Sequence, residues 1–157
     1  MLIQPKLRGF SQKTNIDAYE VGLGLLSLVT PIIDWCRDNT DVFTDIEVVI
    51  TKTAATYFWN RYPMGKKPII VLGAKALVSA ILEGVREYKN VNDALKKFNL
   101  EGTTGVRAVE IIVLHEYAHA LVTSYYGFLC SSEKEKPHGS RFIVFYEYLL
   151  SRYFSMQ

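Results

Sequence analysis

The residues with the clearest chemical signature are His115, Glu116 and His119, which form the pattern H-E-x-x-H. On an α-helix, two histidines at this spacing lie on one face, one turn apart, so their imidazoles can share a metal ion. Glu116 lies next to the first histidine, where its carboxylate can reach a water molecule on that metal without being a ligand. This arrangement is typical of the helix that binds zinc in zinc peptidases. The competing interpretation is a pair of hydrogen-bonded core histidines beside a surface glutamate.

A third metal ligand is expected downstream of this pattern, because a catalytic zinc ion usually has three protein ligands and an open fourth position. The chain contains one further histidine, His138, which follows a polar loop and precedes an amphipathic C-terminal segment. We expect His138 to complete the site. Glu133 and Glu135 are the alternatives, since other zincins use a downstream glutamate as the third ligand.

The sequence around these residues resembles the SprT-like zinc metallopeptidase family. The resemblance rests on the runs His115–Val122, Tyr126–Gly127 and Pro137–Phe142, which together fit H-E-x-x-H followed by a loop and H-G-x-x-F. It covers roughly residues 106–145. The resemblance implies three zinc ligands and a general base, namely His115, His119, His138 and Glu116.

The same resemblance implies an α+β fold in a single zincin-like domain over residues 1–157. We expect a short sheet of about three strands packed against the H-E-x-x-H helix, with helices N-terminal and C-terminal to it. Residues 74–100 are interpreted as a helical elaboration of this domain. The sequence contains no C-x-x-C pair of the kind that a C-terminal zinc ribbon requires, so the family's association with repair of DNA–protein crosslinks is not carried over.

The element that must position the histidines is a helix predicted at Val106–Tyr126, which contains neither Pro nor Gly. Thr103 and Thr104 can cap its start, and Gly127 can end it in the left-handed conformation. The segment is apolar almost all round, which is typical of a buried helix. Imidazole and carboxylate groups inside such a helix are costly unless they have partners, and a bound cation is one partner that serves all three.

The remaining elements follow from periodicity and turn residues. Residues 1 to about 16 read as an irregular leader, and Pro31 should kink or restart the first helix. We predict strands at 46–51, 57–62 and 68–72, and helices from Asp17 to about Arg37, from Ala74 to about Glu87, at 93–98 and from Ser140 onward. A proline at the first position of the third strand is compatible with a sheet edge.

Composition and charge favour an ordinary globular protein. The net charge is +2, although nine Lys or Arg stand against three acids between Lys52 and Lys97. Such a surplus is more often a solvated face than a binding surface, so nucleic acid has only weak support as a partner. Cys36 and Cys130 form no disulfide framework, and the apolar run at 21–33 is too short to span a bilayer. We therefore expect a cytoplasmic protein that does not bind membranes.

These inferences together predict a zinc metallopeptidase that hydrolyses peptide bonds through a zinc-bound water activated by Glu116, with a protein or peptide as substrate. The strand at 68–72, if it lies at the sheet edge, can pair with an extended substrate. An oxyanion donor is useful in such a reaction, and Arg141, Tyr146 and Tyr148 are the candidates near His138. The alternatives are a non-catalytic zinc-containing binding or regulatory module, and a zincin of another family.

Overall fold

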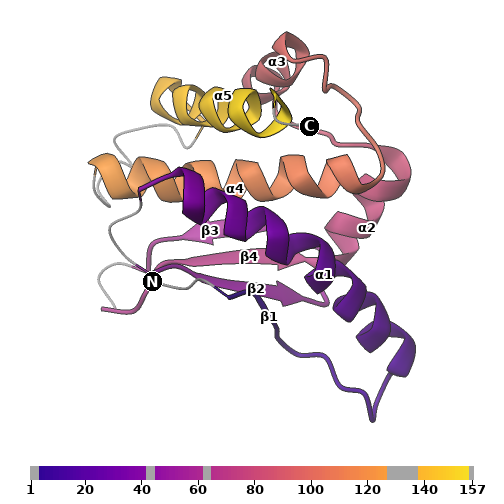
Figure 1. The fold of residues 1–157 in the computed structure, drawn as a ribbon. Helices are drawn as coiled ribbons and strands as arrows, with labels where there is room; N and C mark the ends of the chain where they lie inside the picture. Colours follow the sequence, from indigo (N-terminus) through magenta and orange to yellow (C-terminus); the bar gives the residue numbers. More distant parts are fainter. Residues whose placement is uncertain (1–3, 42–44, 62–64, 127–137, 156–157) are drawn as a thin grey trace.

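The computed structural model describes residues 4–41, 45–61, 65–126 and 138–155 (Figure 1). Within these residues the fold is α+β, with five helices and a mixed sheet of four strands, as the sequence predicted for the fold class. In chain order the elements are β1 (Lys6–Leu7), α1 (Ile16–Asn39), β2 (Glu47–Thr51), β3 (Tyr57–Trp59), β4 (Ile69–Gly73), α2 (Ala74–Glu83), α3 (Lys89–Lys97), α4 (Val106–Tyr126) and α5 (Ser140–Ser155).

Helix α4 lies at the centre of the molecule, and its bounds are those that the sequence predicted. Figure 1 shows α5 on one side of α4, with the sheet and α1 on the other. Residues on all sides of α4 are buried, including Val109, Leu114 and Tyr117. A helix that is apolar on all faces can occupy this central position because none of its faces is exposed to solvent. The histidines of the H-E-x-x-H pattern are therefore carried by a rigid, enclosed element.

The sheet has the strand order β1-β2-β4-β3, in which β1, β2 and β4 are parallel and β3 is antiparallel to β4. Side chains alternate between its two faces. Val48, Ile50, Ile70 and Leu72 face the helices and belong to the main core, whereas Val49, Ile69 and Val71 form a small apolar cluster on the opposite face. The antiparallel strand β3 is last in the strand order, so it is an edge strand, and it lies against α4.

The structure differs from the sequence analysis in three local details. The predicted irregular leader contains β1, because Lys6 and Leu7 align with β2 although the segment carries no strand pattern of its own. The condition that the strand at 68–72 lies at the sheet edge is not met, because β4 pairs with β2 on one side and β3 on the other. The cap of α1 is Asn15, whose side chain accepts a hydrogen bond from the Ala18 amide at 3.0 Å, so the helix begins at Ile16, one residue before the predicted start.

Helix α1 continues through Pro31 to Asn39, which is two residues beyond the predicted end. Among the described helices, it is the one long and apolar enough to cross a membrane by length and composition alone. Core helices of soluble proteins and N-terminal signal sequences meet the same criterion, so this property is weak evidence for a membrane span.

The carboxylate of Glu47 on β2 forms ion pairs with basic side chains near both edge strands of the sheet, β1 and β3. Its Oε1 lies 3.1 Å from Arg8 Nη2 and 3.5 Å from Lys6 Nζ, and its Oε2 lies 2.6 Å from Arg61 Nη2. The hydrogen bond from Arg61 lowers the pKa of Glu47, burial opposes this change, and the charges of Arg61, Lys6 and Arg8 lower the pKa further. The ionised form is therefore stabilised by folding.

We expect Glu47→Gln to lower the free energy of unfolding at neutral pH by up to about 1 kcal/mol, since these ion pairs are solvent-screened. Because the folded-state pKa lies below the ordinary value of 4.5, the contribution is complete above that pH. It is lost as the pH falls through the lowered pKa. Urea unfolding of wild type and Glu47→Gln across the acid range measures how the difference between their free energies of unfolding shrinks as the pH falls. Glu20→Gln on α1 is the control. A difference that stays constant with pH would contradict the assignment.

Candidate metal centre

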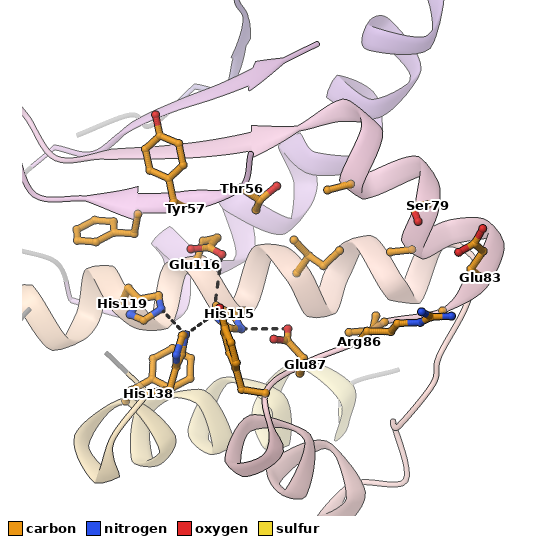
Figure 2. A pocket seen from close by; sticks show the side chains of 18 of the residues that line it. Thr56, Tyr57, Ser79, Glu83, Arg86, Glu87, His115, Glu116, His119 and His138 are labelled. Atoms are coloured by element: carbon orange, nitrogen blue, oxygen red, sulfur yellow. Dashed lines mark hydrogen bonds and ion pairs between the residues drawn. The ribbon is translucent and has the colours of Figure 1, made fainter. Parts of the chain in front are cut away.

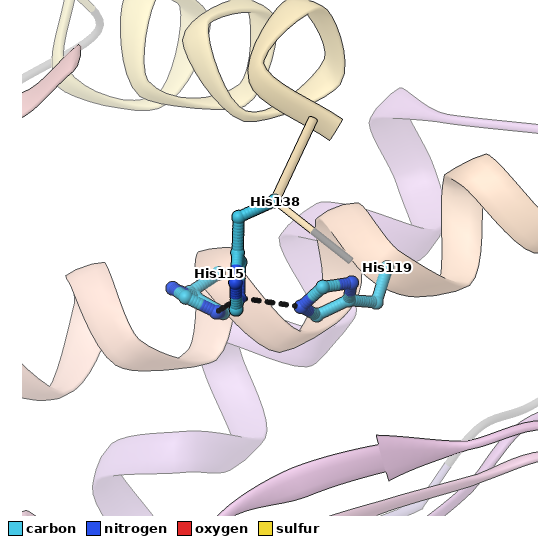
Figure 3. A group of neighbouring side chains, drawn as sticks. All are labelled: His115, His119 and His138. Carbon is cyan, nitrogen blue, oxygen red and sulfur yellow. Dashed lines mark hydrogen bonds between the residues drawn. The ribbon is translucent and has the colours of Figure 1, made fainter. Parts of the chain in front are cut away.

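The three histidines of the chain converge on one point (Figure 3). The Nε2 atom of His138 lies 3.1 Å from Nε2 of His115 and 3.2 Å from Nε2 of His119. His115 and His119 come from one face of α4, as their spacing predicted, and His138 comes from the turn that leads into α5. One ligand atom from each residue lies within 4.8 Å of the other two.

The donor set of this triad fits a metal ion. Three imidazole nitrogens at such distances turn their lone pairs toward a common centre, which is unfavourable unless a cation or protons lie between them. A tetrahedral zinc ion with Zn–N bonds of about 2.0–2.1 Å places its ligand nitrogens about 3.3 Å apart. The separations from His138 to His115 and His119 are close to this value. The triad can therefore bind a metal ion.

An aromatic side chain of α5, Phe142, contacts the whole triad. Its ring centroid lies 4.4 Å from that of His119, 4.9 Å from His115 and 5.0 Å from His138. On the opposite side, the ring of Phe58 on β3 is stacked at 6.5 Å from that of His119. The phenylalanine of the H-G-x-x-F pattern thus forms an apolar floor for the three imidazoles.

This apolar setting keeps His119 neutral. Burial, together with the positive charges that His115 and His138 can carry, lowers its pKa to about 2. Burial also lowers the pKa of His138, assisted by His115 and opposed by Glu87. The neutral imidazole is the form that binds a metal ion, so protons compete weakly for these two ligands.

The segment between α2 and α3, together with the first turn of α3, supports the triad, and the sequence reasoning missed it. The Glu87 Oε1 atom lies 3.1 Å from Nδ1 of His115, and the ring of Tyr88 lies 4.9 Å from that of His138. The side-chain amide of Asn90 donates a hydrogen bond to the carbonyl oxygen of His138. The predicted helix to about Glu87 ends instead at Glu83, where Gly84 has a φ of +100°. An internal glycine in a helical pattern was the available signal for this break.

Glu116 is buried in the wall of the site, with Oε2 3.9 Å from Nε2 of His115. Burial raises the pKa of its carboxyl from 4.5 to about 7, a change that the charge of Glu87 increases and that of His115 opposes. A carboxyl with such a pKa can gain and lose a proton near neutral pH, which is what general base catalysis needs.

A cleft of about 600 Å³ opens onto the triad (Figure 2). Thr56, Tyr57 and Phe58 line it on the side of the sheet, and the segment after α2 lines it on another side. Glu116 and the three histidines lie together in its wall. A molecule entering the cleft therefore meets the triad and the buried carboxylate at one place.

The candidate oxyanion donors do not line this cleft. Tyr146 is fully buried beneath His115, and its hydroxyl has no hydrogen-bond partner among the described residues. Arg141 lies over the ring of Tyr126 at 4.2 Å, and Tyr148 lines a second cavity. The rival ligands Glu133 and Glu135 lie outside the described residues.

Comparisons with known proteins add no assignment to this geometry. No family model, no curated protein and no solved structure matches the chain. The evidence for function is therefore the site itself, in which His115, His119 and His138 form a triad that can bind a metal ion.

Proposed function

We propose that this protein is a zinc-dependent metallopeptidase of the SprT-like kind. The observation that carries the proposal is the approach of His138 Nε2 to both histidines of the H-E-x-x-H helix, with the carboxylate of Glu116 beside them. A purely structural metal site has no need of a buried acid at that place. The sequence pattern and the cleft support the same conclusion.

His115, His119 and His138 would hold the zinc ion through their Nε2 atoms. Three neutral imidazoles are an established ligand set for catalytic zinc. When bound, zinc supplies Lewis acidity, which lowers the pKa of water and polarises a carbonyl group. Phe142 and Phe58 exclude solvent from part of the triad and so strengthen electrostatic interactions within it.

Glu116 is the general base in this proposal. Its carboxylate takes a proton from the attacking water as the oxygen–carbon bond to the peptide carbonyl forms. The same carboxyl then gives the proton to the leaving nitrogen as the carbon–nitrogen bond breaks. Burial raises the pKa of this carboxyl, so it accepts a proton near neutral pH more readily than an exposed carboxyl does.

A protein or peptide in extended form is the substrate class that we infer. Within the described part of the chain, β3 pairs only with β4, so its other edge is open to a further strand. Because β3 also lines the cleft, a peptide paired with it would pass the triad. The pairing with an extended substrate that the sequence analysis gave to the strand at 68–72 is therefore proposed for β3 instead. Cytoplasmic location, the absence of membrane binding and the weak case for nucleic acid stay predictions from the sequence.

Removal of the metal tests the proposal. We expect the purified full-length chain to degrade an unfolded, fluorescently labelled protein, to lose this activity after treatment with a zinc chelator, and to regain it with about one equivalent of zinc. The measurement is the rate of fluorescence release at each step. Hydrolysis that survives complete zinc removal would contradict the proposal, as would zinc-loaded protein that cleaves no unfolded protein or peptide.

A further inference from the structure

We propose that Glu87 is a positioning residue of the metal centre, which fixes the ring orientation and tautomer of His115 from the segment that joins α2 to α3. The inference rests on the proposed function, because it assigns Glu87 to that same site. It adds a residue that lies outside the H-E-x-x-H and H-G-x-x-F patterns, in a part of the chain interpreted as a mere elaboration.

The contact between Glu87 and His115 engages only one of the two ring nitrogens of the histidine. Glu87 Oε1 lies 3.1 Å from Nδ1 of His115, whereas Nε2 of the same ring faces His138 at 3.1 Å (Figure 2). The side chain of Glu87 is 11% exposed and that of His115 is 8% exposed, so water competes little for this hydrogen bond. A carboxylate can only accept, so the hydrogen must lie on Nδ1. The Nε2 lone pair is thereby left for a metal.

The position of Glu87 is set by close backbone packing. A Cβ atom on Gly84 would lie 2.7 Å from the carbonyl oxygen of Gly102, so glycine is required where the segment leaves α2. The next residue, Val85, is buried and donates its amide to the carbonyl of Thr103 at 2.9 Å. The segment is thus anchored to the loop that precedes α4. Glu87 has little freedom to move away from His115.

The same segment and the first turn of α3 also contact the third histidine. Tyr88 lies against the ring of His138, and Asn90 binds the main-chain carbonyl of that residue. His138 comes from outside α4, so its placement depends on such contacts more than that of His115 or His119. Residues 87–90 therefore orient two of the three ligands from one side.

The effect expected of Glu87 is on metal affinity. Partners that hydrogen-bond the far nitrogen of a metal-binding histidine fix its orientation and raise its basicity, and their loss typically lowers metal affinity by about 10–100-fold. We expect Glu87→Ala to weaken zinc binding within this range. Glu87→Gln should weaken it less, because the amide oxygen still accepts from Nδ1 but carries no charge.

The experiment is a zinc titration of the full chain in competition with a chromophoric chelator, for wild type, Glu87→Ala and Glu87→Gln. Glu101→Ala is the matched control, since Glu101 also accepts a side-chain hydrogen bond, from Asn92, but lies outside the cleft. Urea unfolding of the metal-free proteins shows whether a variant is simply less stable.

The zinc affinities decide the inference. Weaker zinc binding in Glu87→Ala, partial recovery in Glu87→Gln and an unchanged control would support it. Zinc affinity equal to that of wild type in both variants would overturn it. If Glu87→Ala does not fold, wild-type affinity in Glu87→Gln would overturn it. Failure of wild type itself to bind zinc would overturn the proposed function, and this inference with it.

Discussion

Replacing Glu116 with glutamine is expected to abolish peptide hydrolysis while leaving the metal bound. Glutamine has almost the same shape as glutamate, but its amide cannot take a proton from water. General base catalysis contributes about 10²–10⁴-fold to a reaction rate, and the loss should be of this size. The measurement is the rate of degradation of a labelled unfolded protein by the zinc-loaded variant, with its zinc content determined in parallel.

Glu110→Gln is the matched control for this experiment. Glu110 is also a buried glutamate of α4, and it accepts a hydrogen bond from Tyr153 of α5 instead of facing the triad. If this control keeps its activity while Glu116→Gln loses it, the loss reflects proton transfer and not the burial of an amide in α4. Full activity of zinc-loaded Glu116→Gln would refute the general base assignment.

The parts of the site that local sequence determines could be predicted. The face shared by His115 and His119 follows from the geometry of a helix, and the bounds of α4 follow from its apolar character and the glycines around it. The approach of His138 to this pair could be expected because the chain offers one histidine beyond the H-E-x-x-H pattern. Phe142 follows His138 by four residues in the sequence, and at the start of α5 its ring contacts that of His138.

The contacts that depend on tertiary packing could not be predicted in this way. Glu87 is 28 residues from His115, and what brings them together is the close approach of Gly84 to Gly102, which no periodicity records. The position of β3 at the sheet edge was missed for a similar reason. The continuous apolar run of β4 is typical of a strand buried on both faces, but the proline before it is equally compatible with an edge, so the sequence left the strand order open.

The support of the site by residues 84–90 changes how the segment between the sheet and α4 is understood. It was interpreted as a helical elaboration of the domain, yet it supplies one wall of the cleft and contacts two of the three histidines. Tyr88 is 68% exposed, so this part of the wall faces solvent. An interpretation based on the two motifs alone would leave this wall out.

Replacing His138 with alanine should remove most of the zinc from the purified protein. Wild type is expected to hold about one zinc ion per chain, because three imidazoles converge on one point. The variant keeps two ligands on α4 and loses the one that closes the triad. Loss of a direct ligand should weaken binding by more than the roughly 10–100-fold typical of a supporting residue. Elemental analysis of both proteins after dialysis measures the difference.

Arg141→Ala is the control for this change, since Arg141 lies close to His138 in sequence but places its guanidinium over Tyr126, away from the cleft. It should retain zinc at the wild-type level. Zinc retained in full by His138→Ala would show that the third ligand is another residue, with Glu133 and Glu135 the first to test. That result would contradict the triad and the resemblance to SprT-like peptidases together, because His138 carries the second half of the pattern on which the resemblance rests.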